Sequence, residues 1–441
     1  MQIEVVDEIM GSGKSYATLK YIEGLAENNQ EERWIFCTEY LSEIEQRTKC
    51  CNLWKTPVDT SSSKLESFKG LLGEPDVQLI AITHSLLISS SVNTYVNYLI
   101  THRGYKLFLD ETIDLINVYN GAKFGDFTKA LRTGECKIDT DNFGKVVWIT
   151  KDDTELTGGY DTSIDKIKVD SLKGFVYCAL KPGSVGDTNS ISLVEIVDDI
   201  IFKRFSRVIV ATYQIDDSLF DAYLNIKNIG KTVCKDVVCS RTTTKNKIKS
   251  CITFIDKYNN TKNFIKETSL SSNWYKDSSN SDDYKLINKI IKYIGDNNGC
   301  KGNAKLLGFT VPSSKLGKQR DAKKIQPVGY PHTVCSVVVD EEGVSREEHS
   351  KSLSTYVPCN ARASNEYAGK VVMIHAYNRY PIQPVLNFLI HYNVRFSSER
   401  FALNEIVQWV WRSAIRNGDN IKLAILSVRM RELFKTWLNK D

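Results

Sequence analysis

The sequence contains no apolar run of about 18 residues or more, so it predicts no membrane-spanning helix. Its first residues, MQIEVVDEI, are short and acidic and lead directly into a glycine-containing loop. A secretory signal peptide needs a basic start and a longer apolar centre, and this segment offers neither. We therefore expect a cytoplasmic protein that makes no contact with a membrane.

The chain also lacks the paired cysteines of a structural zinc site. It has 11 cysteines, an odd number, and none of them forms a C-x-x-C pair. His332 and Cys335 form a single H-x-x-C, but no second pair lies at ligand spacing. Because no secretory signal accompanies them, the cysteines are predicted to be reduced thiols, most of them buried or neutral.

Neither sign of charge dominates the composition. The net charge is +5, with 42% hydrophobic and 25% charged residues, which is typical of a soluble globular protein. A charge this small does not identify a partner. The length of 441 residues exceeds one typical core, so two or three domains are expected.

The first half of the chain alternates between strand and helix patterns. A β-rich run at residues 2–6 is followed by a glycine turn and a helical pattern at 14–28. Further runs predict strands at 34–38, 77–83, 105–109 and 208–212, with helices at about 41–47 and from 84 to about 98. This alternation is typical of a doubly wound parallel sheet, which places the fold in the α/β class. The polar, glycine-rich stretch at roughly 120–205 is predicted to be an inserted accessory region with β character.

A second α/β region is predicted to begin near residue 225. Its strand patterns lie at 251–255, 371–375 and 423–427, and its helical patterns at 282–294 and 429–438. The serine-, asparagine- and lysine-rich stretch 268–283 is predicted to be a loop. These patterns divide the chain into domains at 1–224 and 225–441.

A phosphate-binding loop is predicted between the first strand and the first helix. Glycines let the backbone turn tightly, so that successive N–H groups and the helix N-terminus face an anion. Lys14 would reach the β- and γ-phosphates, and the Ser15 hydroxyl would bind Mg²⁺. The pattern GxxxxGK[ST] fails where Glu8 replaces the first glycine, and a plain glycine turn is the alternative. The predicted nucleotide-binding residues are Met10, Gly11, Ser12, Gly13, Lys14, Ser15 and Tyr16.

Two carboxylates follow another strand of the same half. The run at 105–109 ends in Asp110 and Glu111. Asp110 would hold the magnesium shell, directly or through water, and Glu111 would polarise the attacking water as a general base. The position of this pair, in the same α/β unit as Lys14, supports a magnesium-dependent hydrolytic site.

The segment QWVWRSAIR near the C-terminus spaces three polar residues four apart. Gln408, Arg412 and Arg416 would then share one face of a helix. An arginine delivered to a γ-phosphate stabilises the charge of the transition state. The alternative is a surface amphipathic helix whose core contacts are Trp409 and Trp411.

Taken together, MGSGKS, the LDE strand end and QWVWRSAIR resemble the DEAD-like helicases of superfamily two, in particular DNA helicases encoded by bacteriophages. The resemblance implies two RecA-like domains with ATP and Mg²⁺ between them. It also implies a DNA partner, other phage replication proteins as further partners, and the host cytoplasm as the location. TEY at 38–40 and TH at 83–84 resemble DNA-contact motifs of that group, ATY at 211–213 resembles its third motif, and NARASNEY at 360–367 resembles its fifth motif. The implied DNA-contacting residues are Thr38, Thr83, His84, Arg362 and Asn365.

This sequence departs from that family in its last motif. The family spaces its arginines as Q-x-x-G-R-x-x-R, whereas here Trp411 replaces the glycine and the second arginine falls one residue later. The arginine that reaches the γ-phosphate could therefore be either Arg412 or Arg416. Basic stretches at 241–249 and 301–324 would contact nucleic-acid phosphates, or they are solvated loop faces.

Two rival functions remain open at this point. A viral DNA-packaging ATPase would need an acidic nuclease cluster after the ATPase core, where this chain has arginine and glutamine. In a non-motor nucleic-acid-binding protein, the triphosphate site would be a switch or would be vestigial. The intact Lys14, Asp110 and Glu111 favour hydrolysis.

Overall fold

The structure is a computed structural model of the 441-residue chain. It describes all residues except 59–62, 122–123, 150–162, 181–190, 241–242, 260, 281, 302, 318–323, 331–334, 340–344, 350–353, 360–365 and 441. Its contacts group into two compact units. Unit 1 contains Met1–Glu8, Gly13–Ser240 and Pro381–Ser397, and unit 2 contains Ile9–Ser12, Arg241–Tyr380 and Ser398–Asp441. The division at 224 and 225 stays a prediction about functional domains.

Unit 1 is built on a parallel sheet of seven strands in the order β12-β1-β11-β5-β2-β4-β3. Strand β1, which leads into the phosphate loop, lies next to β11, and β11 lies next to β5, which ends in the two carboxylates. The carboxyl ends of these three strands therefore lie beside one another. The strands are β1 Gln2–Asp7, β2 Trp34–Thr38, β3 Trp54–Lys55, β4 Leu79–Thr83, β5 Lys106–Asp110, β11 Val208–Thr212 and β12 Gly230–Val233.

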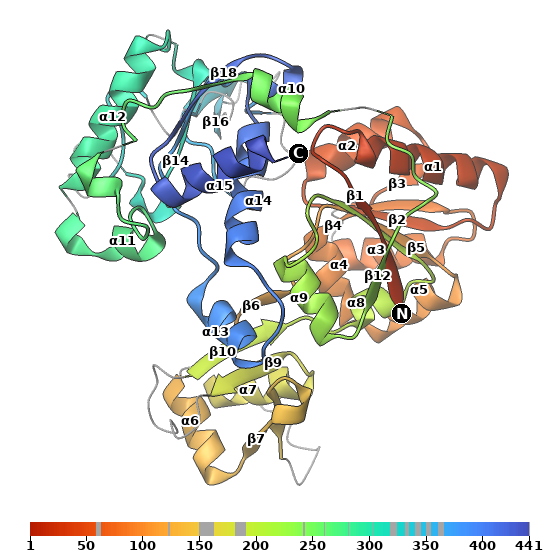
Figure 1. The fold of residues 1–441 in the computed structure, drawn as a ribbon. Helices are drawn as coiled ribbons and strands as arrows, with labels where there is room; N and C mark the ends of the chain where they lie inside the picture. Colours follow the sequence, from red (N-terminus) through yellow and green to blue (C-terminus); the bar gives the residue numbers. More distant parts are fainter. Residues whose placement is uncertain are drawn as a thin grey trace. The chain divides into compact units, whose positions relative to one another are not determined.

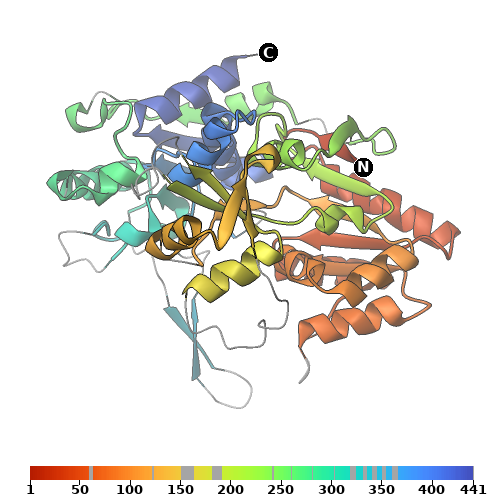
Figure 2. The ribbon, with the colours of Figure 1, turned by 90° about the horizontal axis from the view of Figure 1, so that it is seen from below.

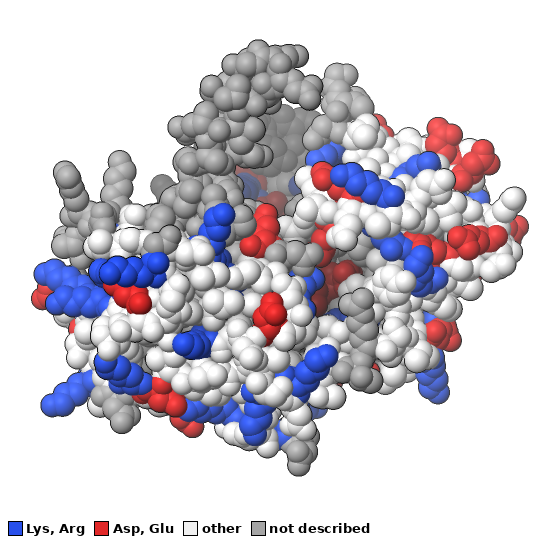
Figure 3. All heavy atoms as spheres, turned by 90° about the horizontal axis from the view of Figure 1, so that it is seen from above, with Lys and Arg blue, Asp and Glu red and all other residues white. Residues whose placement is uncertain are grey.

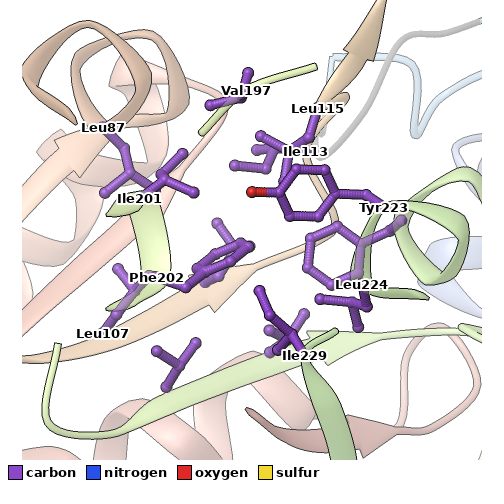
Figure 4. Close-up of a cluster of buried hydrophobic side chains, with 14 of the residues drawn as sticks. Leu87, Leu107, Ile113, Leu115, Val197, Ile201, Phe202, Tyr223, Leu224 and Ile229 are labelled. Atoms are coloured by element: carbon purple, nitrogen blue, oxygen red, sulfur yellow. The ribbon is translucent and has the colours of Figure 1, made fainter. Parts of the chain in front are cut away.

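Helices cover both faces of this sheet because successive strand residues alternate between two apolar clusters. In β2, Ile35 and Cys37 pack into the cluster that the later helices share, whereas Trp34 and Phe36 pack with α1 and α2. Figure 1 shows this layered arrangement, and Figure 4 shows Phe202 and Tyr223, with ring centroids 6.1 Å apart, inside the first cluster. The helices are α1 Lys14–Asn28, α2 Leu41–Cys50, α3 Lys64–Gly73, α4 His84–Ser91, α5 Thr94–His102, α8 Ile200–Lys203 and α9 Leu219–Ile226.

The predicted insertion in unit 1 forms an antiparallel sheet of its own, in the order β6-β10-β9-β8-β7. Helices α6 and α7 pack on one of its faces, where Val176 and Cys178 join their apolar cluster (Figure 2). The expected β character is confirmed, and the two helices are additional. The elements are β6 Ile116–Val118, α6 Phe124–Thr133, β7 Cys136–Asp139, β8 Lys145–Trp148, α7 Ser163–Leu172, β9 Val176–Leu180 and β10 Ile191–Ile196.

The other face of the inserted sheet is covered by a helix from much later in the chain. Helix α13, Gln383–His391, buries Val385, Phe388 and Leu389 in the cluster that holds Tyr177 and Val194. This packing is the reason why Pro381–Ser397 belongs to unit 1. We call this segment the arm.

Unit 2 contains a second parallel sheet, with the strand order β13-β18-β17-β14. Four isoleucines of α12 pack on the Phe309 and Ile374 face, while Trp409 of α14 packs against His375 on the other, with ring centroids 5.1 Å apart. The fold class is therefore α/β with two parallel sheets, as predicted. The elements are α10 Lys245–Ser250, β13 Ile252–Phe254, α11 Ser272–Lys276, α12 Asp283–Asn297, β14 Leu307–Thr310, β15 Cys335–Val339, β16 Ser345–His349, β17 Val372–His375, α14 Ser398–Trp411, β18 Ile421–Ile425 and α15 Val428–Asn439.

Two local predictions need correction. The stretch 268–283 is not a continuous loop, because Ser271 caps the short helix α11 and accepts a hydrogen bond from the Trp274 N–H. The helix expected from 84 to about 98 is two helices, because Asn93 caps a new helix by accepting from the Val96 N–H. No helix among the described residues is long and apolar enough to cross a membrane.

Candidate nucleotide-binding site

The loop between β1 and α1 has the backbone shape that a phosphate site needs. Gly11 and Gly13 have φ angles of 79° and 86°, in the left-handed region that glycine adopts without strain. Gly13 is also the N-cap of α1, and no side chain caps that helix start. The N–H groups of the first turn are therefore left for a ligand, and the helix dipole favours an anion there.

Lys14 lies inside this site and is only 5% exposed. Its ammonium donates to the backbone carbonyl of Glu8 over 3.3 Å and lies 3.8 Å from Oε1 of Glu111. The first glycine of the usual pattern is replaced at Glu8, yet the contact that this residue makes with Lys14 uses only its backbone. The substitution therefore leaves the geometry of the lysine intact.

Ser15 and Asp110 meet across the sheet although they are 95 residues apart. The Ser15 hydroxyl donates to Oδ1 of Asp110 over 2.7 Å. Ser15 follows β1 and Asp110 ends β5, so the strand order brings the two side chains to the same edge. A hydroxyl and a carboxylate in contact form half of an oxygen ligand set suited to Mg²⁺.

Asp110 has an unusual proton affinity in this setting. Burial raises the pKa of its carboxyl to about 7, and the nearby charges of Glu111 and Glu43 add to the increase. The hydrogen bond from Ser15 and the charge of Lys14 act in the opposite direction. A divalent cation would supply the positive charge that this cluster of carboxylates lacks.

Glu111 turns the chain away from strand β5. Its φ angle is 65°, a left-handed conformation that is uncommon for a residue with a side chain. Its N–H is held by the carbonyl of Ala211 over 2.9 Å, so the neighbouring strand β11 fixes this turn. This turn places the Glu111 carboxylate beside the Lys14 ammonium.

The described residues fit a magnesium triphosphate. The side chain of Ser12 is 2% exposed, and its hydroxyl has no hydrogen-bond partner in the part of the chain that the structure describes. A buried unpaired hydroxyl is costly, and a phosphate oxygen would satisfy it. No group of three or more His, Cys, Asp or Glu suited to a metal occurs among the described residues, so the cation would rely on Ser15, Asp110 and phosphate oxygens. Of the other two predicted residues, Met10 is buried and Tyr16 is exposed.

The predicted DNA-contacting residues of unit 1 lie on neighbouring strands. Thr38 and Thr83 are paired in register at the carboxyl ends of β2 and β4. Thr38 donates its hydroxyl to Glu43, and Thr83 caps α4 by accepting from the Leu86 N–H. His84, the first residue of α4, is buried. Both threonines thus have structural partners, and their contacts with DNA stay predictions.

The expected helix around Gln408 is wrong in its last part. Helix α14 ends at Trp411, and Ser413 starts a separate 3₁₀ turn at Ala414–Asn417. The Ser413 hydroxyl donates to the Val410 carbonyl over 2.7 Å, which redirects the chain. Gln408, Arg412 and Arg416 therefore do not share one helix face: Arg412 is 4% exposed in the turn, whereas Arg416 is exposed.

The structure brings together Lys14, Ser15, Asp110 and Glu111 in unit 1, while Gln408, Arg412 and Arg416 belong to unit 2. Arg362 and Asn365 lie outside the described residues. So do Arg241 and Lys318 and part of the stretch around them, within the two predicted basic stretches. On the face shown in Figure 3, basic and acidic side chains are interspersed.

Sequence reasoning missed two carboxylates near the site. Asp7, the last residue of β1, accepts from the N–H groups of Gln214 over 2.7 Å and Ile215 over 3.1 Å. Glu43 contributes to the electrostatics of Asp110 from α2. The position of Asp7 directly after a strand, next to the loop, was the available signal. The sequence offered no such signal for Glu43, because an acidic residue in the first turn of a helix is common.

Comparisons with known proteins agree with parts of this description. Residues 246–438 match the family model described as the YonV C-terminal Rossmann-like domain. The chain is 26% identical over 450 residues to the SPbeta prophage-derived uncharacterized protein YonV of Bacillus subtilis (strain 168), covering 100% of this chain and 99% of that protein. The solved "Structure of S. tokodaii Xpd4" aligns with a TM-score of 0.42 and 13% identity, covering 99% of this chain and 94% of that one. The second half of the chain is thus similar to a Rossmann-like domain, in keeping with its parallel sheet.

Proposed function

We propose that this protein is an ATP hydrolase that uses the energy of hydrolysis to move along or unwind DNA. The observation that carries the hydrolase proposal is the contact between the Ser15 hydroxyl and Asp110, with Lys14 3.8 Å from Glu111 at the same strand ends. Few other chemistries need a lysine at a helix start, a hydroxyl and two carboxylates in one place. A nucleoside triphosphate with Mg²⁺ uses all four.

In this proposal each residue has one task. Lys14 and the backbone N–H groups of the loop bind the β- and γ-phosphate oxygens. Ser15 and Asp110 hold Mg²⁺, which would neutralise charge on those oxygens. Glu111 accepts a proton from water as the water oxygen bonds to the γ-phosphorus, and the bond to the β–γ bridging oxygen breaks to leave ADP and phosphate.

The motor part of the proposal has separate support. The segments MGSGKS, LDE and QWVWRSAIR resemble phage DNA helicases, and the chain has two parallel-sheet units of the kind that such motors use. The similarity to a prophage-derived protein supports a phage setting, with DNA replication or recombination as the process served. Gln408 and an arginine, Arg412 or Arg416, are proposed to respond to the bound triphosphate.

The test is a measurement of phosphate release with Mg²⁺ and ATP, in the presence and absence of single-stranded DNA. The motor proposal expects strong stimulation by DNA and loss of hydrolysis in Lys14→Ala, with DNA binding largely retained. Lys20→Ala is the matched control, because Lys20 lies six residues later on the exposed face of α1. Normal turnover by Lys14→Ala would contradict the assignment of the site.

The same measurement distinguishes the rival functions. A non-motor switch would bind ATP without DNA-dependent turnover. Hydrolysis that depends on a duplex end and displaces no strand from 5′- or 3′-tailed duplexes would favour a packaging ATPase. Strand displacement from one of the two tailed duplexes would support a helicase and would assign its polarity.

A further inference from the structure

The arm, Pro381–Ser397, leaves unit 2 and returns to it within 17 residues, yet its own contacts lie in unit 1. Its helix α13 is held by more than apolar burial. The ring of Phe388 lies 6.4 Å from that of Tyr177, edge to face, and the Tyr392 hydroxyl donates to the Cys178 carbonyl over 2.8 Å. Because these contacts bury the whole inner face of α13, the arm and the inserted sheet form one packed body.

A single arginine fixes both stems of the arm inside unit 2. Arg429, near the start of α15, donates to the carbonyl of Arg379 over 2.8 Å before the arm and to that of Ser398 over 3.0 Å after it. It also donates to Oδ1 of Asn378 over 3.2 Å, and its side chain is 8% exposed. The planar guanidinium allows three contacts at fixed angles, so the two stems cannot separate without breaking these partly buried hydrogen bonds.

The returning end of the arm is tied to the loop that follows β11. The Ser397 N–H donates to the carbonyl of Asp217 over 2.9 Å, and the Arg395 guanidinium forms an ion pair with the Asp217 carboxylate. Asp217 has a φ angle of 58°, and Asp221 accepts its N–H over 2.9 Å. The conformation of this loop is therefore fixed by several independent contacts.

The same loop is tied to the phosphate site. Asp7 accepts from the N–H groups of Gln214 and Ile215, and the Glu8 N–H donates to the carbonyl of Thr212 over 3.1 Å. The carbonyl of Glu8 in turn accepts from Lys14. Hydrogen bonds and short backbone segments thus connect Lys14, through the loop at 213–217, to Ser397.

The connection to unit 2 is one peptide bond long. Ser397 is held by Asp217, and the next residue, Ser398, is the first residue of α14 and is held by Arg429. Successive Cα atoms are about 3.8 Å apart, so the two anchored residues are direct neighbours along the chain. Helix α14 carries Gln408 and leads to Arg412.

We propose that the arm couples the nucleotide state of the phosphate site to helix α14, with Asp217 and Arg395 as positioning residues for the hydrolytic cycle. The inference rests on the proposed function. Binding or loss of the γ-phosphate changes the contacts of Lys14, and the loop at 213–217 passes that change through Asp217 to the start of α14. In the opposite direction, DNA bound by unit 2 alters hydrolysis along the same route.

The test reverses the charges of the ion pair. Asp217→Arg and Arg395→Asp are each expected to lower the stimulation of ATPase activity by single-stranded DNA by roughly 5-fold or more, with basal activity within about twofold of wild type. The double variant, which restores opposite charges, is expected to recover most of the stimulation. Lys173→Asp is the control for Arg395→Asp, because it also replaces a positive by a negative charge, on an exposed lysine of the inserted region.

Each result leads to a decision. Full stimulation in both single variants overturns the coupling role, as does a double variant that melts like wild type and remains unstimulated. If a reversal lowers the melting temperature, Arg395→Gln replaces it, since it removes the charge of a side chain that is 77% exposed. A wild-type protein without ATPase activity would instead overturn the proposed function, so the two failures are distinguishable.

Discussion

The two parallel sheets present very different polar groups at their carboxyl ends. In the loop after β1, the Ser12 hydroxyl has no hydrogen-bond partner among the described residues, and the Lys14 ammonium donates to a carbonyl over 3.3 Å and lies 3.8 Å from Oε1 of Glu111. At the end of β17 in unit 2, the amide of Asn378 makes three hydrogen bonds, to Glu267 and Ser269 carbonyls and from Arg429. Asn378 and Arg429 are both buried.

The difference shows that a shared architecture does not make a shared site. The carboxyl edge of a parallel sheet collects loops and helix starts, and is a common place for ligands. Around Asn378 and Arg429, however, the chain itself uses the polar groups, to hold segments 267–269 and the stems of the arm, although the Thr310 hydroxyl at the end of β14 has no hydrogen-bond partner among the described residues. The loop after β1 leaves the Ser12 hydroxyl and the start of α1 without side-chain partners among the described residues, so this edge gains most from a bound anion.

The largest effect that we expect from changing either sheet edge is the loss of ATP hydrolysis in Glu111→Gln. The substitution keeps the shape of the side chain but removes the general base, so ATP hydrolysis is expected to fall by roughly 10²–10⁴-fold. ATP binding should persist, since neither Lys14 nor the glycine loop is altered. Single-turnover hydrolysis together with binding of a fluorescent ATP analogue measures the two effects separately. A parallel loss of binding would show that Glu111 acts on the nucleotide itself.

The second prediction concerns the hydrogen bonds of Asn378, after β17 in unit 2. Asn378→Ala removes three hydrogen bonds and leaves the buried Ser269 carbonyl without its amide donor, so the free energy of unfolding should fall by about 2–4 kcal/mol. Chemical denaturation monitored by tryptophan fluorescence would measure it. Basal ATPase activity per folded molecule is expected to stay at the wild-type level, and a loss of it at full stability would mean that this edge also takes part in hydrolysis.

The smallest predicted effect depends on pH. Burial lowers the pKa of His375 to about 3, and the imidazole packs against Trp409. Between pH 6.5 and about 3 the unfolded chain binds the proton more tightly, so the stability that His375 contributes is present above pH 6.5 and is lost as the pH falls. Relative to His375→Gln, the wild type should lose about 2 kcal/mol of unfolding free energy between pH 7.5 and 5. An unchanged difference between the two proteins would show that this imidazole is already protonated or is hydrated when folded.

Much of unit 1 could be predicted because its signals are local. The helix at 14–28 and the strands at 34–38 and 208–212 have the predicted bounds, since β-branched runs, glycines and helical spacing all lie within each segment. Ser15 and Asp110 were each predicted to bind Mg²⁺, and the structure brings them into contact because strand ends in a parallel sheet share one edge. Their catalytic roles stay predictions.

The parts that could not be predicted depend on distant partners. The end of α14 is set by the Ser413 hydroxyl turning back to Val410, a choice that a four-residue spacing of polar side chains does not encode. The apolar face of α13 indicates burial, but nothing in QPVLNFLIH specifies a sheet built nearly 200 residues earlier. Asp217 and Arg395 likewise become neighbours only after both segments have folded.

The arm has a consequence for the order of events during synthesis. Val194 and Ile196 of the inserted sheet need α13 as their cover, and that helix is translated almost two hundred residues after them. A ribosome-bound chain that has just finished Ser240 would still expose this apolar surface, and so would a truncated fragment ending there. Maturation of the N-terminal core therefore waits until nearly the whole polypeptide has been made.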